Sequence, residues 1–114
     1  MIKTGAHAEK LAAQFLQQQG LILLQTNYHC RFGEIDLILK DGDTHVFVEV
    51  RLRSSAAFGG AAASIDARKQ AKLLKTAQFY LSELKRIPPC RFDAVLMQSA
   101  DLQQIEWIKN AFTA

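Results

Sequence analysis

Apolar residues recur at helical spacing in two segments of the chain. From Gly5 to Gln19 they lie three and four residues apart, as on one face of an amphipathic helix, and Gly20 follows as a stop signal. From Ile65 to Lys85 the spacing repeats, and two prolines at 88 and 89 close the segment. The expected buried faces are Ala8, Leu11, Ala12, Phe15 and Leu16 in the first segment, and Ala67, Ala71, Leu74, Ala77, Leu81 and Leu84 in the second.

Five shorter apolar runs predict strands, over residues 21–28, 32–39, 44–52, 91–97 and 104–109. Asp41-Gly42-Asp43 between the second and third runs predicts a tight hairpin, and a turn near Ala100-Asp101 separates the last two. Residues 54–64 follow neither period and are expected to form a connection beside the third strand, where loops commonly carry function. The order helix, three strands, helix, two strands predicts an α/β domain.

Alternation along the second strand separates its charged and apolar side chains. Because side chains point to opposite faces in turn, Glu34 and Asp36 are expected on one face and Ile35, Leu37 and Leu39 on the other. The pattern therefore predicts two carboxylates on one side of the sheet.

The third strand repeats this arrangement with an acid and two bases. Glu49, Arg51 and Arg53 are expected on the face opposite the core residues Val46, Val48, Val50 and Leu52. If the hairpin pairs the two strands, Asp36 and Glu49 approach each other, and carboxylate oxygens suit Mg²⁺ or Mn²⁺. The alternative is a pair of solvated acids, salt-bridged to the two arginines and of little energetic consequence.

Composition limits the size and setting of the protein. A chain of 114 residues that is 49% hydrophobic predicts a single domain over residues 1–114. Its two cysteines, Cys30 and Cys90, are expected to be buried free thiols. No stretch approaches the roughly 20 apolar residues that span a bilayer, and no apolar leader is present, which predicts a cytoplasmic protein without a membrane partner.

Basic residues gather on the second predicted helix. The net charge of +3 is compatible with nucleic acid but does not require it. Arg68, Lys72 and Lys75 recur at positions i, i+4 and i+7, with Lys69 beside them, so they form a stripe that could follow a phosphate backbone. An ordinary solvated helix face remains the alternative. The three histidines have no metal-site spacing, and the aromatic residues of the predicted helix and strands are assigned to the core.

Several of these segments together resemble a known family. They are Gly33-Glu34-Ile35-Asp36, Phe47-Val48-Glu49-Val50-Arg51-Leu52-Arg53, Lys69-Gln70 and Arg91-Phe92-Asp93. Over nearly the whole chain the sequence resembles the YraN family of uncharacterised bacterial proteins. That family is similar to archaeal Holliday-junction resolvases within the PD-(D/E)xK restriction-endonuclease-like superfamily, whose mixed central sheet is flanked by helices.

The resemblance implies a nucleic acid phosphodiester as substrate, and the carboxylate pair suits Mg²⁺ or Mn²⁺ as its cofactor. Asp36 takes the place of the motif's Asp and Glu49 that of the acid in the ExK element, while Glu9 takes the place of a helical Glu and Glu34 is a further candidate ligand. Gln70 matches a polar residue that follows the core motif. Arg51 stands where ExK has lysine, and a guanidinium cannot act as a general base, although it still stabilises negative charge.

Three hypotheses about function follow. The first is a metal-dependent endonuclease acting on DNA, including branched DNA, with Arg51, Arg53, Arg68, Lys69, Gln70 and Lys72 as nucleic-acid contacts. The second is a non-catalytic nucleic-acid-binding or protein-interaction module with the same fold. The third is a structural subunit, since resolvase-like domains act as homodimers.

Overall fold

Two helices and a five-stranded sheet make up the part of the chain that the computed structural model describes, namely residues 6–53, 65–98 and 101–112. The elements are α1 (Ala6–Gln18), β1 (Ile22–Cys30), β2 (Gly33–Asp41), β3 (Thr44–Arg53), α3 (Ala67–Leu81), β4 (Cys90–Gln98) and β5 (Asp101–Phe112). The strands lie in the order β1-β2-β3-β4-β5. Only β3 and β4 are parallel, so the sheet is mixed. The predicted α/β class and element order are confirmed.

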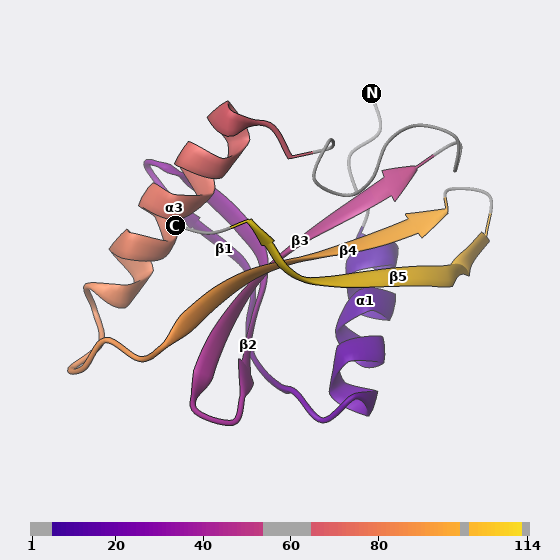
Figure 1. Cartoon of the computed structure of the whole chain (residues 1–114), viewed down its shortest axis with the longest axis horizontal. Coiled ribbons are helices and arrows are strands. Elements are labelled where there is room, and N and C mark those ends of the chain that lie inside the picture. The colour runs from indigo at the N-terminus through magenta and orange to yellow at the C-terminus, as the bar shows by residue number, and fades with distance from the viewer. Residues whose placement is uncertain (1–5, 54–64, 99–100, 113–114) are drawn as a thin grey trace.

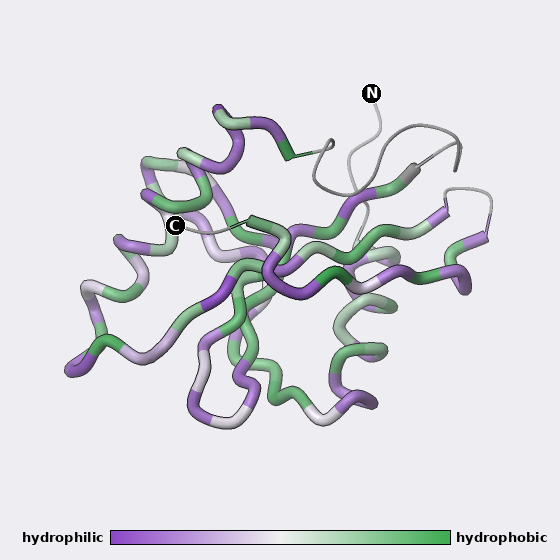
Figure 2. Tube along the Cα trace, in the orientation of Figure 1, coloured by the Kyte–Doolittle hydropathy of each residue, from purple (hydrophilic) through white to green (hydrophobic). Residues whose placement is uncertain are grey.

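The helices cover opposite faces of the sheet (Figure 1). Small residues of α1 pack with apolar side chains of β2, β3 and β4 in one buried cluster, while α3 packs on a second cluster across the sheet. Apolar segments accordingly run through the middle of the molecule and polar ones lie at the ends of the strands (Figure 2). The central strands β2, β3 and β4 are thus buried on both faces.

The first helix ends as predicted. Gly20 adopts a φ of 100°, a conformation that costs glycine little, and the Leu21 amide donates to the Leu16 carbonyl. Gly5, with which the prediction began the helix, lies outside the described residues.

The second helix differs from its prediction at both ends and in its buried face. Asp66 caps it by accepting from the Lys69 amide, and it ends at Leu81, before the predicted Lys85. Ala77 is buried as predicted, and Leu74 and Leu81 pack against the same cluster, but Ala67 and Ala71 are exposed. Leu73 and Thr76, which were not predicted, are buried beside Ala77. The helix meets β2 at Gly33, where an added Cβ would lie 3.1 Å from the Thr76 hydroxyl oxygen, so the close approach to this glycine fixes which face turns inward.

Strands β2 and β3 form the predicted hairpin and then separate. Asp41 pairs with Thr44 across a turn in which Gly42 has a φ of 62°, and the ladder runs as far as Leu37 opposite Val48. Beyond that pair β3 stays bonded to β4, as far as Arg53 opposite Gln98, while β2 continues beside β1 alone. The two strands therefore split at Asp36 and Glu49.

The face assignment along β2 is partly wrong. Leu37 and Leu39 pack on the α1 side, but Ile35 packs on the α3 side together with Ile38. The change of face falls between Ile35 and Leu37, where β2 loses its pairing with β3. The assignment for β3 is confirmed for Val46, Val48 and Val50, all of which lie in the α1-side core.

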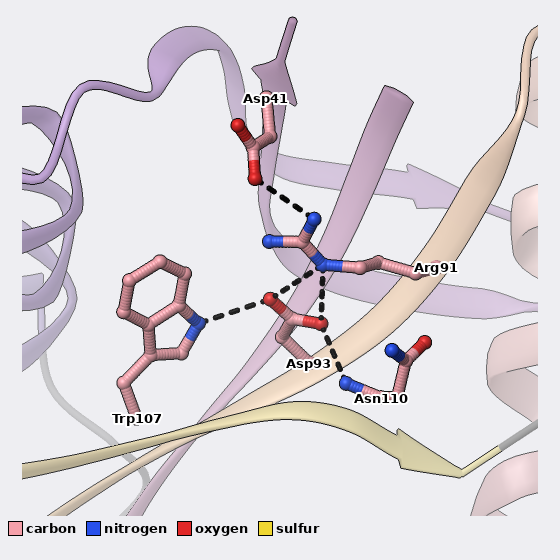
Figure 3. Close-up of polar contacts among 5 residues, drawn as sticks. All are labelled: Asp41, Arg91, Asp93, Trp107 and Asn110. Atoms are coloured by element: carbon pink, nitrogen blue, oxygen red, sulfur yellow. Dashed lines mark hydrogen bonds and ion pairs between the residues drawn. The ribbon is translucent and has the colours of Figure 1, made fainter. Parts of the chain in front are cut away.

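A buried polar network ties β5 to the rest of the sheet (Figure 3). Both oxygens of Asp93 accept from Arg91 Nε, at 3.1 and 3.2 Å, while Trp107 Nε1 donates to one oxygen at 2.9 Å and the Asn110 amide to the other at 3.0 Å. Arg91 also donates to Asp41 beside the hairpin turn, at 2.8 Å. The network thus joins β2 to β4 and β5, which come much later in the sequence.

Two other expectations can be compared with the structure. Neither described helix is long and apolar enough to cross a membrane.

Cys30 and Cys90 are free, but Cys30 is half-buried and Cys90 exposed, so the expectation of two buried thiols is wrong. Residues 54–64, the predicted connection, lie outside the described residues, as does Ala100 of the predicted turn.

Candidate functional site

Asp36 and Glu49 occupy the point where β2 and β3 separate. One oxygen of Asp36 accepts from the Val50 amide at 2.8 Å, a bond that replaces the next rung of the ladder. Glu49 lies one residue before Val50 and is only 5% exposed. The split therefore brings together two carboxylates that the sequence places 13 positions apart, and their approach is as expected.

Two cations lie against Glu49. Lys69 in the first turn of α3 places its Nζ 3.2 Å from Glu49 Oε2, and Arg51, two residues along β3, places a guanidinium nitrogen 3.6 Å from the same oxygen. Asp66 caps α3 at its start, so the lysine three residues later projects over the sheet. Helix and strand thus supply one positive charge each to a single carboxylate.

These cations do not offset the electrostatic cost of burying the acids. Burial and the nearby Asp36 charge raise the pKa of Glu49 to about 7, despite the opposing effect of Lys69 and Arg51. Burial also raises the pKa of Asp36, although the Val50 amide and Lys69 oppose this. The site therefore holds more negative charge than its surroundings stabilise.

Glu9 and Glu34 flank this pair. The carboxyl groups of Glu9 and Asp36 share a hydrogen bond, and burial together with the Asp36 charge raises the pKa of Glu9. The charge of Glu34 acts on both Glu9 and Asp36, but Glu34 itself is ion-paired with His29 at 2.9 Å. Of the four predicted metal ligands, Asp36, Glu49 and Glu9 are brought into one neighbourhood and Glu34 lies at its margin.

The predicted nucleic-acid contacts fall into two groups. Arg51 and Lys69 lie in the carboxylate site, whereas Arg68 and Lys72 are exposed on the outer side of α3. Gln70 donates its side-chain amide to the Ile65 carbonyl at 2.8 Å and so helps to fix the start of the helix. Arg53 is the last residue of β3, and its side chain is not among those described.

The ligands available for a cation are carboxylate oxygens. Within residues 6–53, 65–98 and 101–112, no group of three or more His, Cys, Asp or Glu side chains is placed so that it could hold a metal ion, so Glu9 does not complete a three-ligand site with Asp36 and Glu49. Mg²⁺ commonly uses only one or two carboxylates and completes its octahedron with water and substrate phosphate. A two-carboxylate site therefore fits Mg²⁺ or Mn²⁺ better than it fits Ca²⁺ or Zn²⁺.

Sequence reasoning missed two features of this region. Lys69 was assigned to a phosphate-binding stripe, and nothing in helical spacing indicates that it reaches the carboxylate on β3. The acceptor role of Asp93 was also missed, although Arg91 and Asp93 two residues apart on one strand must share a face, which is a readable signal for an ion pair.

The fold and site define a class of protein: an α/β domain with a buried carboxylate pair where two strands diverge, flanked by basic residues. The sequence model of a family described as "Uncharacterised protein family UPF0102" matches residues 8–97. UPF0102 protein NE0719 of Nitrosomonas europaea is 61% identical over 108 residues, covering 95% of this chain and 92% of that protein. A UPF0102 protein of Methylobacillus flagellatus is 54% identical over the full length of both chains.

The chain belongs to the UPF0102 family. This family is the YraN family that the motifs resembled, so the resemblance is confirmed. The relatives' names state no activity, and function rests on the geometry of the site.

Proposed function

We propose that this protein is a divalent-metal-dependent nuclease that acts on phosphodiesters in DNA, with Asp36 and Glu49 as its metal ligands. The supporting observation is that both acids are held together at the strand split with raised pKa values. Strongly perturbed carboxylates are commonly found at functional sites. A bound cation relieves the repulsion between the two groups.

Each part of the site has a distinct role in this proposal. When bound, Mg²⁺ or Mn²⁺ polarises a phosphoryl oxygen and lowers the pKa of a coordinated water. Lys69 and Arg51 approach from two elements and stabilise negative charge on the phosphate. Glu9, bonded to Asp36, fixes the orientation of that carboxylate.

Lys69 also bears on the departure from the ExK pattern. Arg51 stands at the strand position of the motif lysine, but the ammonium group of Lys69 reaches the same Glu49 oxygen from α3. A lysine is thus present at the carboxylate in space although it is absent from the strand. This supports retention of a lysine in the site by a different route.

The exposed basic residues of α3 give the proposal its nucleic acid partner. Arg68, Lys72 and Lys75 are exposed on the helix that carries Lys69. A phosphate backbone following this stripe would pass the carboxylate site at the start of the helix. Such contacts confer affinity without base recognition.

Metal titration followed by incubation with DNA tests the proposal. Mg²⁺ and Mn²⁺ are titrated calorimetrically into the wild type and into Asp36→Asn/Glu49→Gln, and each protein is then incubated with branched, duplex and single-stranded DNA. We expect binding heat and cleavage in the wild type, and at least a 10²-fold loss of cleavage in the variant, because each lost electrostatic contact costs on the order of 10²–10³ in rate. The matched control is Asp43→Asn/Glu83→Gln, which removes two exposed carboxylates and should change neither readout.

A second function is favoured by one observation. Glu49 already has two cationic partners, so the site is partly neutralised without a metal. A nucleic-acid-binding module that has lost turnover would retain this arrangement. DNA binding by the wild type without metal heat and without cleavage would establish the module and overturn the nuclease.

A further inference from the structure

A groove runs beside the carboxylate site between α1 and the edge strand β1. Its volume is about 410 Å³, within the range of small-molecule sites of about 300–1,000 Å³. The walls come from one side of α1 and from the middle of β1, and the floor includes Ala13 and Leu23.

The groove is continuous with the carboxylate site. Glu9 lines it and also bonds to Asp36, while Asn27 lines it from the opposite wall and bonds to Glu9. From Glu9 to Gln17 the lining extends over eight residues of α1, or about 12 Å at 1.5 Å per residue. This length corresponds to roughly three stacked nucleotides at about 3.4 Å each.

The chemistry of the lining suits exposed bases better than a phosphate backbone. Gln14, Gln17 and Asn27 contribute neutral amides to the lining and Thr26 a hydroxyl, so both donors and acceptors are available beside an apolar floor. Lys10 is the basic residue of the lining. Amides of this kind bind base edges, which are free in an unpaired strand and turned inward in a duplex.

The backbone of β1 is irregular where it faces the groove. Its register with β2 shifts between Leu23 and Gln25, and Asn27 adopts a φ of 52°, which is uncommon for a residue other than glycine. Bulges and such outliers concentrate next to functional sites because they redirect side chains. The irregularity is a second, independent indication that this edge is shaped to bind a ligand.

We propose that the groove between α1 and β1 binds two or three unpaired nucleotides of the substrate strand, adjoining the phosphodiester at Asp36 and Glu49. This inference rests on the proposed nuclease function and narrows its substrate to DNA with a single-stranded stretch beside the cleavage point. Duplex on the other side of that point follows the basic stripe of α3.

Oligonucleotide binding in EDTA tests the groove separately from metal chemistry. Anisotropy of a fluorescein-labelled 12-mer oligothymidylate, and of a duplex of the same length, is measured with the wild type and with Gln14→Ala/Gln17→Ala. We expect about ten-fold weaker binding of the oligothymidylate and unchanged duplex binding, because the lost hydrogen bonds contribute modestly and together amount to about a factor of ten. The matched control, Gln18→Ala/Gln19→Ala, removes two exposed amides of the same helix end that lie outside the groove and should change neither affinity.

A second variant tests whether the apolar floor of the groove, rather than its amides, makes the contacts with the oligonucleotide. Gln14→Trp fills the groove and should weaken oligothymidylate binding at least ten-fold while leaving the melting temperature within a few degrees. Unchanged oligothymidylate affinity in both variants, or equal losses for oligothymidylate and duplex, overturns the inference. The same measurement with oligouridylate shows whether the groove distinguishes ribose from deoxyribose. Equal losses of affinity for oligouridylate and oligothymidylate would mean that the groove binds unpaired RNA as well as unpaired DNA.

The two proposals fail in different ways. If the wild type shows neither heat of metal binding nor cleavage, the nuclease proposal is refuted. Oligonucleotide binding measured in EDTA would still test whether the groove binds unpaired nucleotides. Cleavage of single-stranded and branched DNA that is unaffected by the groove variants would refute the groove and leave the nuclease intact.

Discussion

Asp93 and Glu49 are buried carboxylates on neighbouring strands of one sheet, but the groups that surround them differ. Asp93, 1% exposed, accepts from the Arg91 guanidinium, the Trp107 indole and the Asn110 amide (Figure 3). Glu49, 5% exposed, faces a second carboxylate, and burial with that neighbour raises its pKa to about 7. Because Asp93 pairs with Val48 and Glu49 with Ala94, the two acids project from opposite faces.

The difference is the one expected between an acid that holds the fold together and an acid that, under the proposed function, binds a cation. A buried charge whose acceptor capacity is filled by fixed donors stabilises the fold only through that complete set of partners. A buried charge beside a like charge is held in place at a cost, and the fold keeps it available for a ligand that removes the cost. The carboxylate on the α1 side thus has a complete set of donors, whereas the one on the α3 side faces a like charge, as the proposed metal site requires.

The largest expected effect comes from breaking the hydrogen-bond network around Asp93. Asp93→Asn removes the charge that balances Arg91 and replaces an acceptor oxygen by an amide donor facing other donors. We expect a loss of about 3–5 kcal/mol in the free energy of unfolding, as for other broken buried ion pairs, measured by urea denaturation. Asp101→Asn, an exposed carboxylate that accepts from the Gln103 amide, is the control and should cost no more than about 1 kcal/mol. A loss below 1 kcal/mol in Asp93→Asn would contradict the structural role.

Neutralising Glu49 should increase the free energy of unfolding, whereas neutralising Asp93 should decrease it. An acid whose folded pKa lies at about 7, above the ordinary 4.5, contributes stability that is fully present below about pH 4.5 and is lost as the pH rises through about 7. In EDTA the wild type should therefore lose stability as the pH rises from about 4.5 to about 7. Glu49→Gln should flatten this profile and be more stable than the wild type at pH 8, by on the order of 1–2 kcal/mol.

Thermal unfolding across that pH range is the measurement for Glu49. Glu83→Gln removes an exposed carboxylate and should reproduce the wild-type profile. If Glu49→Gln is less stable than the wild type at pH 8, its ion pairs with Lys69 and Arg51 outweigh the repulsion, and the contrast with Asp93 disappears.

The smallest effect on stability is expected on the outer face of α3. Arg68→Ala and Lys72→Ala remove exposed charges and should change the free energy of unfolding by no more than about 0.5 kcal/mol. Each should nevertheless reduce the slope of log affinity for duplex DNA against log salt concentration by about 1. Lys85→Ala, exposed beyond the end of α3, is the control. An unchanged slope in both helix variants would exclude the stripe as a phosphate contact.

The order of the elements could be predicted because it depends on local pattern. Helical spacing, Gly20 and the Asp-Gly turn are local signals, and each specified an element or its end. The buried face of α3 could be predicted only in part. Ala77 is buried as expected, but Thr76, which approaches the sequence-distant Gly33, was not predicted. Local periodicity allows several faces to turn inward, and tertiary packing selects one.

The candidate site likewise has features that the sequence predicts and features that it does not. The meeting of Asp36 and Glu49 follows from hairpin register, which the turn fixes, so the sequence was sufficient to predict it. The contact between Lys69 and Glu49 depends on where the crossover helix lies over the sheet, and the Asp93 network depends on the position of β5. These placements are set by long-range packing that a single sequence does not specify.

The single parallel pair in the sheet has a consequence for the order of folding. Asp36 and Glu49 come together through a two-residue turn, whereas His45 meets Cys90 only after a 45-residue excursion that contains α3. Closing a short hairpin costs less chain entropy and takes place faster than closing a long crossover. The two acids should thus be neighbours early in folding, and Lys69 should join them only when the helix docks, so the growing sheet carries its greatest local negative charge before the native state is reached.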